Sequence, residues 1–244
     1  MQKKYNSHVA VIFAGGIGRR MNNKALPKQF LKLYGKEILI YTIEHFENHS
    51  DIQGIVIVCV EEWIPFLQEL LKKYQIKKVA AIVPGGETGQ DSIFNGLCAA
   101  KESYGDEGVV LIHDGVRPLI NEQTITDCLE CVEKNGNAIT VAPVVETIIR
   151  VDDDLIKDVI KRSECLMARA PQCFALRDIL AVHDKSRREN NIDFIDSASL
   201  MRYYGHSLSV VQGPVENIKI TTPMDYYTFR ALYDARENEQ LFGG

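Results

Sequence analysis

A glycine-rich turn followed at once by cations is the stretch of this chain best suited to chemistry. The apolar run 9–13 ends in residues with little or no side chain: Ala14, Gly15, Gly16 and Gly18. Glycines let a ligand approach bare backbone N–H groups, which form anion-binding concavities. Arg19, Arg20 and Lys28 follow, and their positive charges suit phosphate oxygens. The stretch therefore predicts a loop that binds a phosphorylated ligand.

Three kinds of phosphate-binding loop can be compared with this stretch. The P-loop pattern G-x-x-x-x-G-K-[ST] is absent. The dinucleotide pattern requires a glycine where Met21 stands, and an acidic residue about 20 residues further on; the next apolar run ends only near Glu61. A nucleotidyltransferase loop accounts for the whole run A-G-G-x-G-x-R-M and for the Pro27–Lys28 pair. A structural turn beside a solvated basic patch would be the non-functional interpretation.

The elements that must position this loop alternate along the first 135 residues. Short apolar runs at 9–13, 54–60, 77–86 and 108–115 predict buried strands, and amphipathic segments between them predict helices. Such alternation predicts a parallel sheet with helices on both faces. We therefore expect one domain, 1–244, with a Rossmann-like three-layer α/β fold. In such sheets ligands bind at the carboxyl ends of the strands, where loop 14–21 lies.

The second half of the chain departs from this alternation at about 140–172. The segment E-T-I-I-R-V-D-D-D-L-I-K-D-V-I-K-R-S-E predicts two strands around an acidic turn, long enough to leave the body as a β-arm. Segment 208–221 predicts a further strand. Asp91 or Ser92 is expected to cap the helix that follows the third strand, and Gly136 to end the next helix.

Composition excludes several classes of function. The chain has 244 residues and a net charge of −5, which argues against a protein coated for nucleic acid. No apolar run approaches the roughly 18–20 residues of a membrane span, and the first ten residues are too short and polar for a secretory signal. We expect no membrane partner and a cytoplasmic location.

Six motifs in their order along the chain resemble one family. They are AGGIGRRM…LPKQF, VPGGETGQDSIFNGL, LIHDGVRP, APVVETI, APQCF and ENIKITTPMDY. Together they are similar to the cytidylyltransferases acting on polyol phosphates, which include 2-C-methyl-D-erythritol 4-phosphate cytidylyltransferase and ribitol-5-phosphate cytidylyltransferase. The resemblance implies a nucleotidyltransferase fold and transfer of CMP from CTP to a polyol phosphate, with release of pyrophosphate.

The resemblance also implies roles for residues around the nucleotide. Arg20, Lys28 and Lys219 match catalytic positions on the triphosphate. Asp114 ends an apolar strand, where a carboxylate suits Mg²⁺. The loop that embraces cytosine and ribose matches Pro84, Gly85, Gly86 and Ser92. Gly89 stands where many relatives carry an arginine, so the contacts of that arginine are not expected here.

The acceptor side is implied by a second group of positions. Thr147 and Arg162 match residues that bind the substrate's phosphate, and Arg117 and Glu216 are further candidates for the substrate site. In the family the arm crosses to a second subunit, so the resemblance implies a homodimer. Asp196 matches an acidic family position but is also a good helix cap.

Which polyol is the acceptor is left open by the sequence. The first loop and the region around Trp63 resemble the ribitol-phosphate branch, whereas APVVET and DSASLMRYYGH resemble the methylerythritol branch. D-ribitol 5-phosphate is slightly favoured over 2-C-methyl-D-erythritol 4-phosphate. Two further hypotheses are a nucleotidyltransferase that uses another nucleoside triphosphate and a catalytically idle nucleotide-binding subunit.

Overall fold

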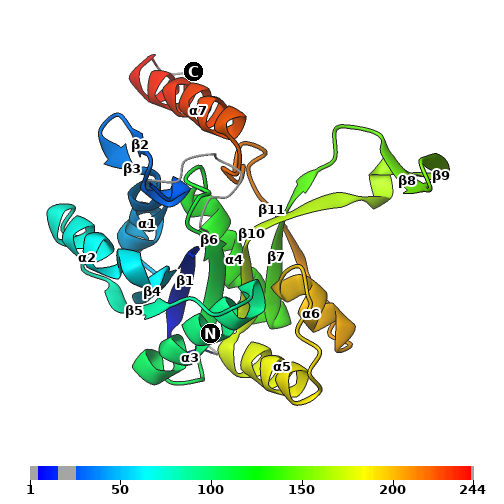
Figure 1. Cartoon of the computed structure of the whole chain (residues 1–244), viewed down its shortest axis with the longest axis horizontal. Helices are drawn as coiled ribbons and strands as arrows, with labels where there is room; N and C mark the ends of the chain where they lie inside the picture. Colours follow the sequence, from blue (N-terminus) through cyan, green and yellow to red (C-terminus); the bar gives the residue numbers. More distant parts are fainter. Residues whose placement is uncertain (1–4, 16–25, 243–244) are drawn as a thin grey trace.

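The computed structural model describes residues 5–15 and 26–242, and it is shown in Figure 1. Gly16, Gly18 and Arg20 therefore lie outside the described residues. No helix of the described part is long and apolar enough to cross a membrane.

A seven-stranded sheet forms the centre of the molecule, with strand order β11-β7-β10-β6-β1-β4-β5. Its strands are parallel except β10, which runs antiparallel to both β6 and β7. The bounds are β1 His8–Ala14, β4 Gly54–Cys59, β5 Val79–Pro84, β6 Val109–Asp114, β7 Asn137–Pro143, β10 Leu166–Ala175 and β11 Val210–Gln212. The predicted mostly parallel α/β sheet is confirmed.

Helices cover both faces of this sheet (Figure 1). Side chains of a strand alternate between its two faces, and here both faces are apolar and pack against helices. In β1, Ala10 and Ile12 pack toward α1, α2 and α4, while Val9 and Val11 pack toward α3, α5 and α6. The helices are α1 Ile38–Asn48, α2 Ile64–Lys73, α3 Gly89–Tyr104, α4 Glu122–Asn135, α5 Leu176–Arg188 and α6 Ser197–Tyr203. These three layers fix the strand ends on which a site can be built.

The C-terminal helix α7 (Pro223–Phe242) packs at one end of the body through a third apolar cluster. Phe229 is fully buried there, and its ring meets the Tyr41 ring of α1 edge to face at 5.8 Å. The small β2–β3 hairpin (Lys32–Leu33 and Lys36–Glu37) adds Leu33 to the same cluster. This cluster anchors the segment 214–222, which leads into α7.

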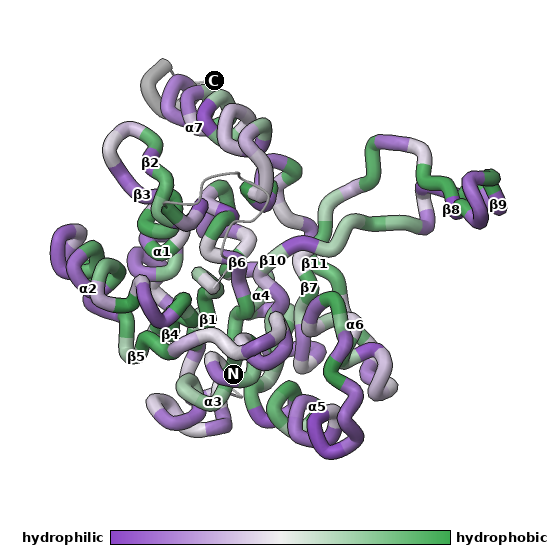
Figure 2. Tube along the Cα trace, viewed as in Figure 1, coloured by the Kyte–Doolittle hydropathy of each residue, from purple (hydrophilic) through white to green (hydrophobic). Residues whose placement is uncertain are grey.

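The predicted hairpin of the second half stands away from the body as an arm (Figure 1). Strands β8 (Ile148–Asp152) and β9 (Leu155–Ile160) pair antiparallel, and Asp153 and Asp154 form the turn with φ of 43° and 62°. Figure 2 shows apolar residues along the arm. Its exposed apolar side chains are Ile149, Val151, Leu155, Ile156 and Val159.

Two local expectations need correction, and a third is confirmed. The cap of α3 is Thr88 rather than Asp91 or Ser92, because the Thr88 and Asp91 side chains complete a reciprocal capping box. Segment 208–221 is a strand only at Val210–Gln212, since a turn at 214–217 follows it. Gly136 ends α4 in the left-handed conformation (φ 81°), as expected.

Candidate active site

A cavity of about 590 Å³ lies at the carboxyl ends of β1, β5 and β6. Ala14 and Asp114, the last residues of β1 and β6, line it, and so does the loop after β5. Because β10 runs antiparallel, the beginning of β10 reaches this same edge and also lines the cavity. The cavity therefore has one wall before α3 and another around β6 and β10.

The loop between β5 and α3 forms the first wall and is held by its own side chains. The Ser92 hydroxyl accepts a hydrogen bond from Gly86 N at 3.0 Å and donates one to Thr88 O at 3.0 Å. A Cβ added at Gly86 would lie 2.3 Å from Asp91 Cβ, so this position has no room for a side chain. Asp91 is fixed by Thr88 and by an ion pair with Arg187 at 2.6 Å.

Gly89 lies on the same wall but in open space. A Cβ added there would meet nothing within 4 Å. Crowding among the described residues is therefore not the reason that this position lacks a side chain.

Lys28 also lines the cavity, from the short 3-10 helix Lys28–Phe30. This turn is tied to the end of β1, because the Gln29 side-chain amide donates to Ala14 O at 2.5 Å. The contact keeps Lys28 at the glycine-rich end of β1. Arg20, its expected partner, lies outside the described residues.

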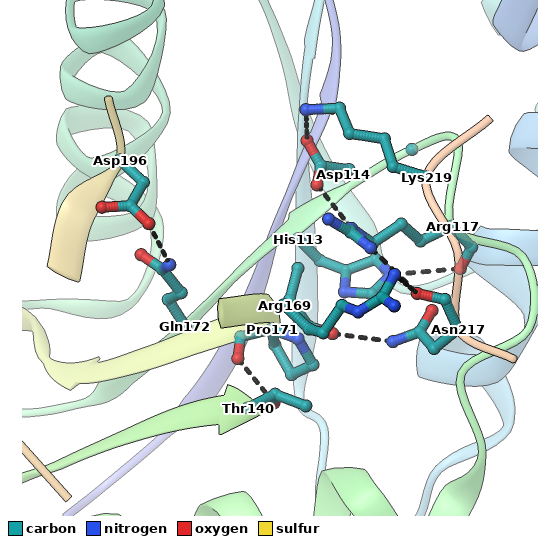
Figure 3. A network of polar contacts seen from close by, with 12 residues as sticks. His113, Asp114, Arg117, Thr140, Arg169, Pro171, Gln172, Asp196, Asn217 and Lys219 are labelled. Carbon is teal, nitrogen blue, oxygen red and sulfur yellow. Dashed lines mark hydrogen bonds and ion pairs between the residues drawn. The ribbon is translucent and has the colours of Figure 1, made fainter. Parts of the chain in front are cut away.

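Asp114 is the charged centre of the second wall (Figure 3). Its carboxylate forms ion pairs with Lys219 Nζ at 2.6 Å and with Arg117 Nε at 2.8 Å. Burial by itself raises the pKa of Asp114, but the charges and hydrogen bonds of Lys219 and Arg117 outweigh it and hold that pKa well below its usual value. Asp114 is therefore an anion at neutral pH and holds Lys219 at the cavity.

His113 precedes Asp114 but is fully buried. Its Nε2 lies 3.2 Å from Arg117 O, and its ring meets Phe46 edge to face. Burial lowers the pKa of His113 to about 3. The imidazole is therefore neutral at physiological pH, and its contacts support the loop 114–117.

Sequence reasoning did not find Arg169 and Gln172, which line this wall, or Asn217, which supports it. The Gln172 amide donates to Asp196 at 2.8 Å, and its oxygen accepts from Ala198 N at 2.9 Å. Asn217 donates to Ala170 O at 2.8 Å, and its backbone carbonyl oxygen accepts from Arg117 NH1 at 2.9 Å. The A-P-Q motif marks this part of β10 in the sequence, but nothing in the motif reveals that the strand lines the cavity.

The remaining predicted residues are dispersed. Asp196 lines the cavity and caps α6 through a capping box with Ser199. Thr147 and Arg162 lie exposed at the root of the arm, where Arg162 NH1 donates to Val145 O at 3.0 Å. Glu216 pairs with Arg236 of α7 at 3.3 Å. Thr147, Arg162 and Glu216 are not among the residues that line the described part of the cavity.

Comparisons with known proteins agree with this architecture. Residues 8–233 match the family described as IspD, 2-C-methyl-D-erythritol 4-phosphate cytidylyltransferase. A ribitol-5-phosphate cytidylyltransferase of Vibrio parahaemolyticus is 54% identical over 97% of this chain and 100% of its own length. A 2-C-methyl-D-erythritol 4-phosphate cytidylyltransferase of Clostridium novyi is 38% identical, over 90% of this chain and 94% of its own.

Solved structures give the same result. A 4-diphosphocytidyl-2C-methyl-D-erythritol synthase from Anaerococcus prevotii superposes with a TM-score of 0.80 at 25% identity, covering 93% of this chain and 96% of its own. The motifs, the sheet order, the cavity and these matches agree, and the chain belongs to the 2-C-methyl-D-erythritol 4-phosphate cytidylyltransferase family of CTP-dependent nucleotidyltransferases.

Proposed function

We propose that this protein transfers CMP from CTP to D-ribitol 5-phosphate, giving CDP-ribitol and pyrophosphate. The observation that carries the choice of acceptor is the identity to relatives of each kind. Two relatives named ribitol-5-phosphate cytidylyltransferase are 54% and 50% identical over 97% of the chain. The relative from Clostridium novyi with the methylerythritol name is 38% identical. Methylerythritol 4-phosphate is the second candidate acceptor.

The nucleotide occupies the wall built from β1 and the β5–α3 loop. Ala14 and Gly15, together with Gly16 and Gly18, approach the triphosphate, while Pro84, Gly85, Gly86 and Ser92 enclose the cytidine. What supports this is the lack of space for a Cβ at Gly86 and the locked Ser92 hydroxyl, which give the loop one fixed shape.

The chemistry is an in-line attack of an acceptor phosphate oxygen on the α-phosphorus of CTP. The bond to the pyrophosphate oxygen breaks, and that oxygen leaves with the electron pair. Positioning and stabilisation of negative charge provide most of the catalysis in such a reaction. Lys28 and Lys219, with Arg20, supply that positive charge, and Asp114 holds Lys219 in place at 2.6 Å.

Mg²⁺ fits this site through Asp114. Magnesium usually takes one or two protein carboxylates and fills its other positions with phosphate oxygens and water. Asp114 is the last residue of β6, lines the cavity with a side chain that is 24% exposed, and stays ionised. A bound Mg²⁺ would neutralise charge on the triphosphate, while the orientation of Asp114 comes from Arg117.

A homodimer completes the acceptor site in this proposal. A lone two-stranded hairpin is marginally stable in water, and this one exposes apolar side chains along both of its strands. Thr147 and Arg162 lie at the arm's root and do not line the described part of their own chain's cavity. The arm therefore carries them to the cavity of the second subunit, where a hydroxyl and a guanidinium bind the acceptor.

The test is the ratio of kcat/KM for D-ribitol 5-phosphate and 2-C-methyl-D-erythritol 4-phosphate, measured with CTP and Mg²⁺ by pyrophosphate release. We expect ribitol phosphate to be favoured by at least about tenfold, since one group of methyl size is worth about 1–3 kcal/mol. The other three nucleoside triphosphates serve as controls. A ratio that favours methylerythritol phosphate would overturn the proposed choice of acceptor. Equal turnover with all four nucleoside triphosphates would overturn the proposed preference for CTP.

A further inference from the structure

The Arg169 side chain lines the cavity, and no carboxylate of the described residues pairs with its guanidinium group. It lies on β10 and lines the cavity. Its NH1 donates one long bond, 3.4 Å, to Asn217 O, and its Nε is buried with no hydrogen-bond partner among the described residues. No carboxylate in the same part of the chain pairs with it. Buried polar groups are normally hydrogen-bonded, so such a group requires an explanation.

The surroundings of Arg169 are positive. Arg117 NH1 donates to the same Asn217 oxygen at 2.9 Å, so two guanidinium groups converge on one carbonyl (Figure 3). Arg117 is neutralised by Asp114, which also binds Lys219. The Asp114 carboxylate thus pairs with two cations of this wall, Arg117 and Lys219, and not with Arg169. Burial and the charge of Arg117 lower the pKa of Arg169, which marks an environment unfavourable to its charge.

The backbone places Arg169 there through an irregularity in β10. Ala168 pairs with Val141 and Gln172 with Ile139, so residues 169–171 face the single residue Thr140 of β7. Thr140 Oγ1 donates to Pro171 O at 2.7 Å, and Asn217 donates to Ala170 O, which hold the irregular stretch. Bulges of this kind redirect side chains beside active sites.

The position of β10 in the sheet indicates which anion Arg169 binds. In the sheet, β6 separates β10 from β1, and β4 lies between β1 and β5. Strands are spaced by about 4.8 Å, so β10 lies roughly 19 Å from the β5 end that encloses the nucleoside. β10 instead lies next to β6 on the side away from β1, at the part of the cavity farthest from that nucleoside end.

We propose that Arg169 binds the phosphate monoester of the acceptor and thereby favours phosphorylated polyols over free ones. The inference rests on the proposed function. A guanidinium presents a planar fork that matches phosphate oxygens in a bidentate manner, and the anion relieves the repulsion from Arg117. Arg169 is a residue that contacts substrate, in addition to those expected from the sequence.

The first test is steady-state kinetics of Arg169→Gln and Arg169→Lys. Loss of a hydrogen-bonded charge on phosphate should raise the acceptor KM by about 10- to 100-fold in Arg169→Gln. The KM for CTP should stay within about twofold of the wild-type value. The acceptor KM of Arg169→Lys should lie between those of wild type and Arg169→Gln, because lysine keeps the charge but not the planar, bidentate geometry. The matched control is Arg177→Gln, which removes an exposed arginine paired with Glu107 just beyond the opposite end of β10.

The second test is a readout that a structural arginine would not give. Arg169 makes one long bond and faces a like charge, so Arg169→Gln should melt at the same temperature as wild type or higher. Inorganic phosphate should inhibit wild type competitively with the acceptor, and this inhibition should weaken about tenfold or more in Arg169→Gln. Free ribitol should inhibit both proteins equally.

These outcomes separate the inference from the proposed function. Unchanged phosphate inhibition, a CTP KM that rises with the acceptor KM, or a lower melting temperature in both Arg169 variants overturns the role of Arg169. If wild type turns over neither polyol phosphate, the proposed function fails instead. Calorimetric titration of inorganic phosphate into wild type and Arg169→Gln then still decides whether Arg169 binds a phosphate.

Discussion

Two neighbouring glycines of the β5–α3 loop should respond oppositely to the same substitution. In Gly86→Ala the new Cβ would meet Asp91 Cβ at 2.3 Å, where ordinary contact begins at about 3.4 Å. The loop must therefore shift by about 1 Å, because Asp91 is fixed by Thr88 and Arg187. In Gly89→Ala the Cβ enters open space at the first turn of α3.

The magnitudes follow from this geometry. Overpacking of a fixed site costs about 1–3 kcal/mol, which for a chain of this size lowers the melting temperature by roughly 2–12 °C. A displacement of about 1 Å in a positioning loop can cost about 10²-fold in rate. Gly89→Ala should instead gain about 0.4–1 kcal/mol, because alanine restricts the unfolded chain and favours the helix.

The assay combines thermal unfolding by circular dichroism with kcat/KM for CTP at saturating acceptor. We expect Gly86→Ala to lose stability and about 10²-fold in kcat/KM, and Gly89→Ala to gain stability with unchanged kinetics. A Gly86→Ala enzyme within twofold of wild type in kcat/KM would refute the idea that this loop has one functional shape. A Gly89→Ala enzyme as impaired as Gly86→Ala would refute the steric argument.

Four further outcomes test the site and the fold. Lys28→Ala should lower kcat by about 10²–10³ while the melting curve is unchanged; turnover within threefold of wild type would remove Lys28 from the mechanism. Asp114→Asn should raise the Mg²⁺ concentration needed for half-maximal rate, and full turnover of wild type in excess chelator would contradict a metal role. Mixed dimers of Arg162→Ala and Lys28→Ala chains should regain activity, because one hybrid site has both residues. Proven subunit exchange without recovery of activity, or a monomer in sedimentation at micromolar concentration, would contradict the proposal that the arm completes the site of the second subunit. His183 is buried on α5. Burial lowers its pKa to about 4 and that of His113 to about 3. Below about pH 6.5 each unfolded imidazole therefore takes up a proton that the folded form does not, and the free energy of unfolding should fall by about 2 kcal/mol per histidine from pH 7 to 5. Urea titrations of His183→Gln should show a fall smaller by that amount, and a pH dependence equal to that of wild type would contradict the assignment.

Much of the fold followed from local sequence patterns. The runs 9–13, 54–60 and 108–115 became β1, β4 and β6 because continuous apolar stretches of this length fit a strand buried on both faces. Gly136 ended a helix because a left-handed residue closes its last turn. The acidic turn at Asp153 and Asp154 was correctly predicted between two strands.

The remainder depended on contacts between distant residues. β10 lies between β6 and β7, and nothing in its own composition reveals that it runs antiparallel. For that reason Arg169 and Gln172 could not be assigned to the cavity from sequence. Lys219 could be placed by its motif, but its irregular backbone is set by Asn217 contacts with Ala170 and Arg117.

The two walls of the cavity come from different stretches of the chain, so the sequence of one wall can vary while the other is kept. The wall proposed to bind the nucleotide ends at the start of α3, whereas β10 and the segment around Lys219 belong to the last third of the chain. β10 is held to β6 and β7 by backbone hydrogen bonds, which tolerate a change of side chains. Substitutions confined to β10 can therefore alter the part of the cavity around Arg169 while the ends of β1 and β5 are kept. A chimaera that carries residues 166–203 of a relative would exchange β10, α5 and α6 together and leave the first wall unchanged.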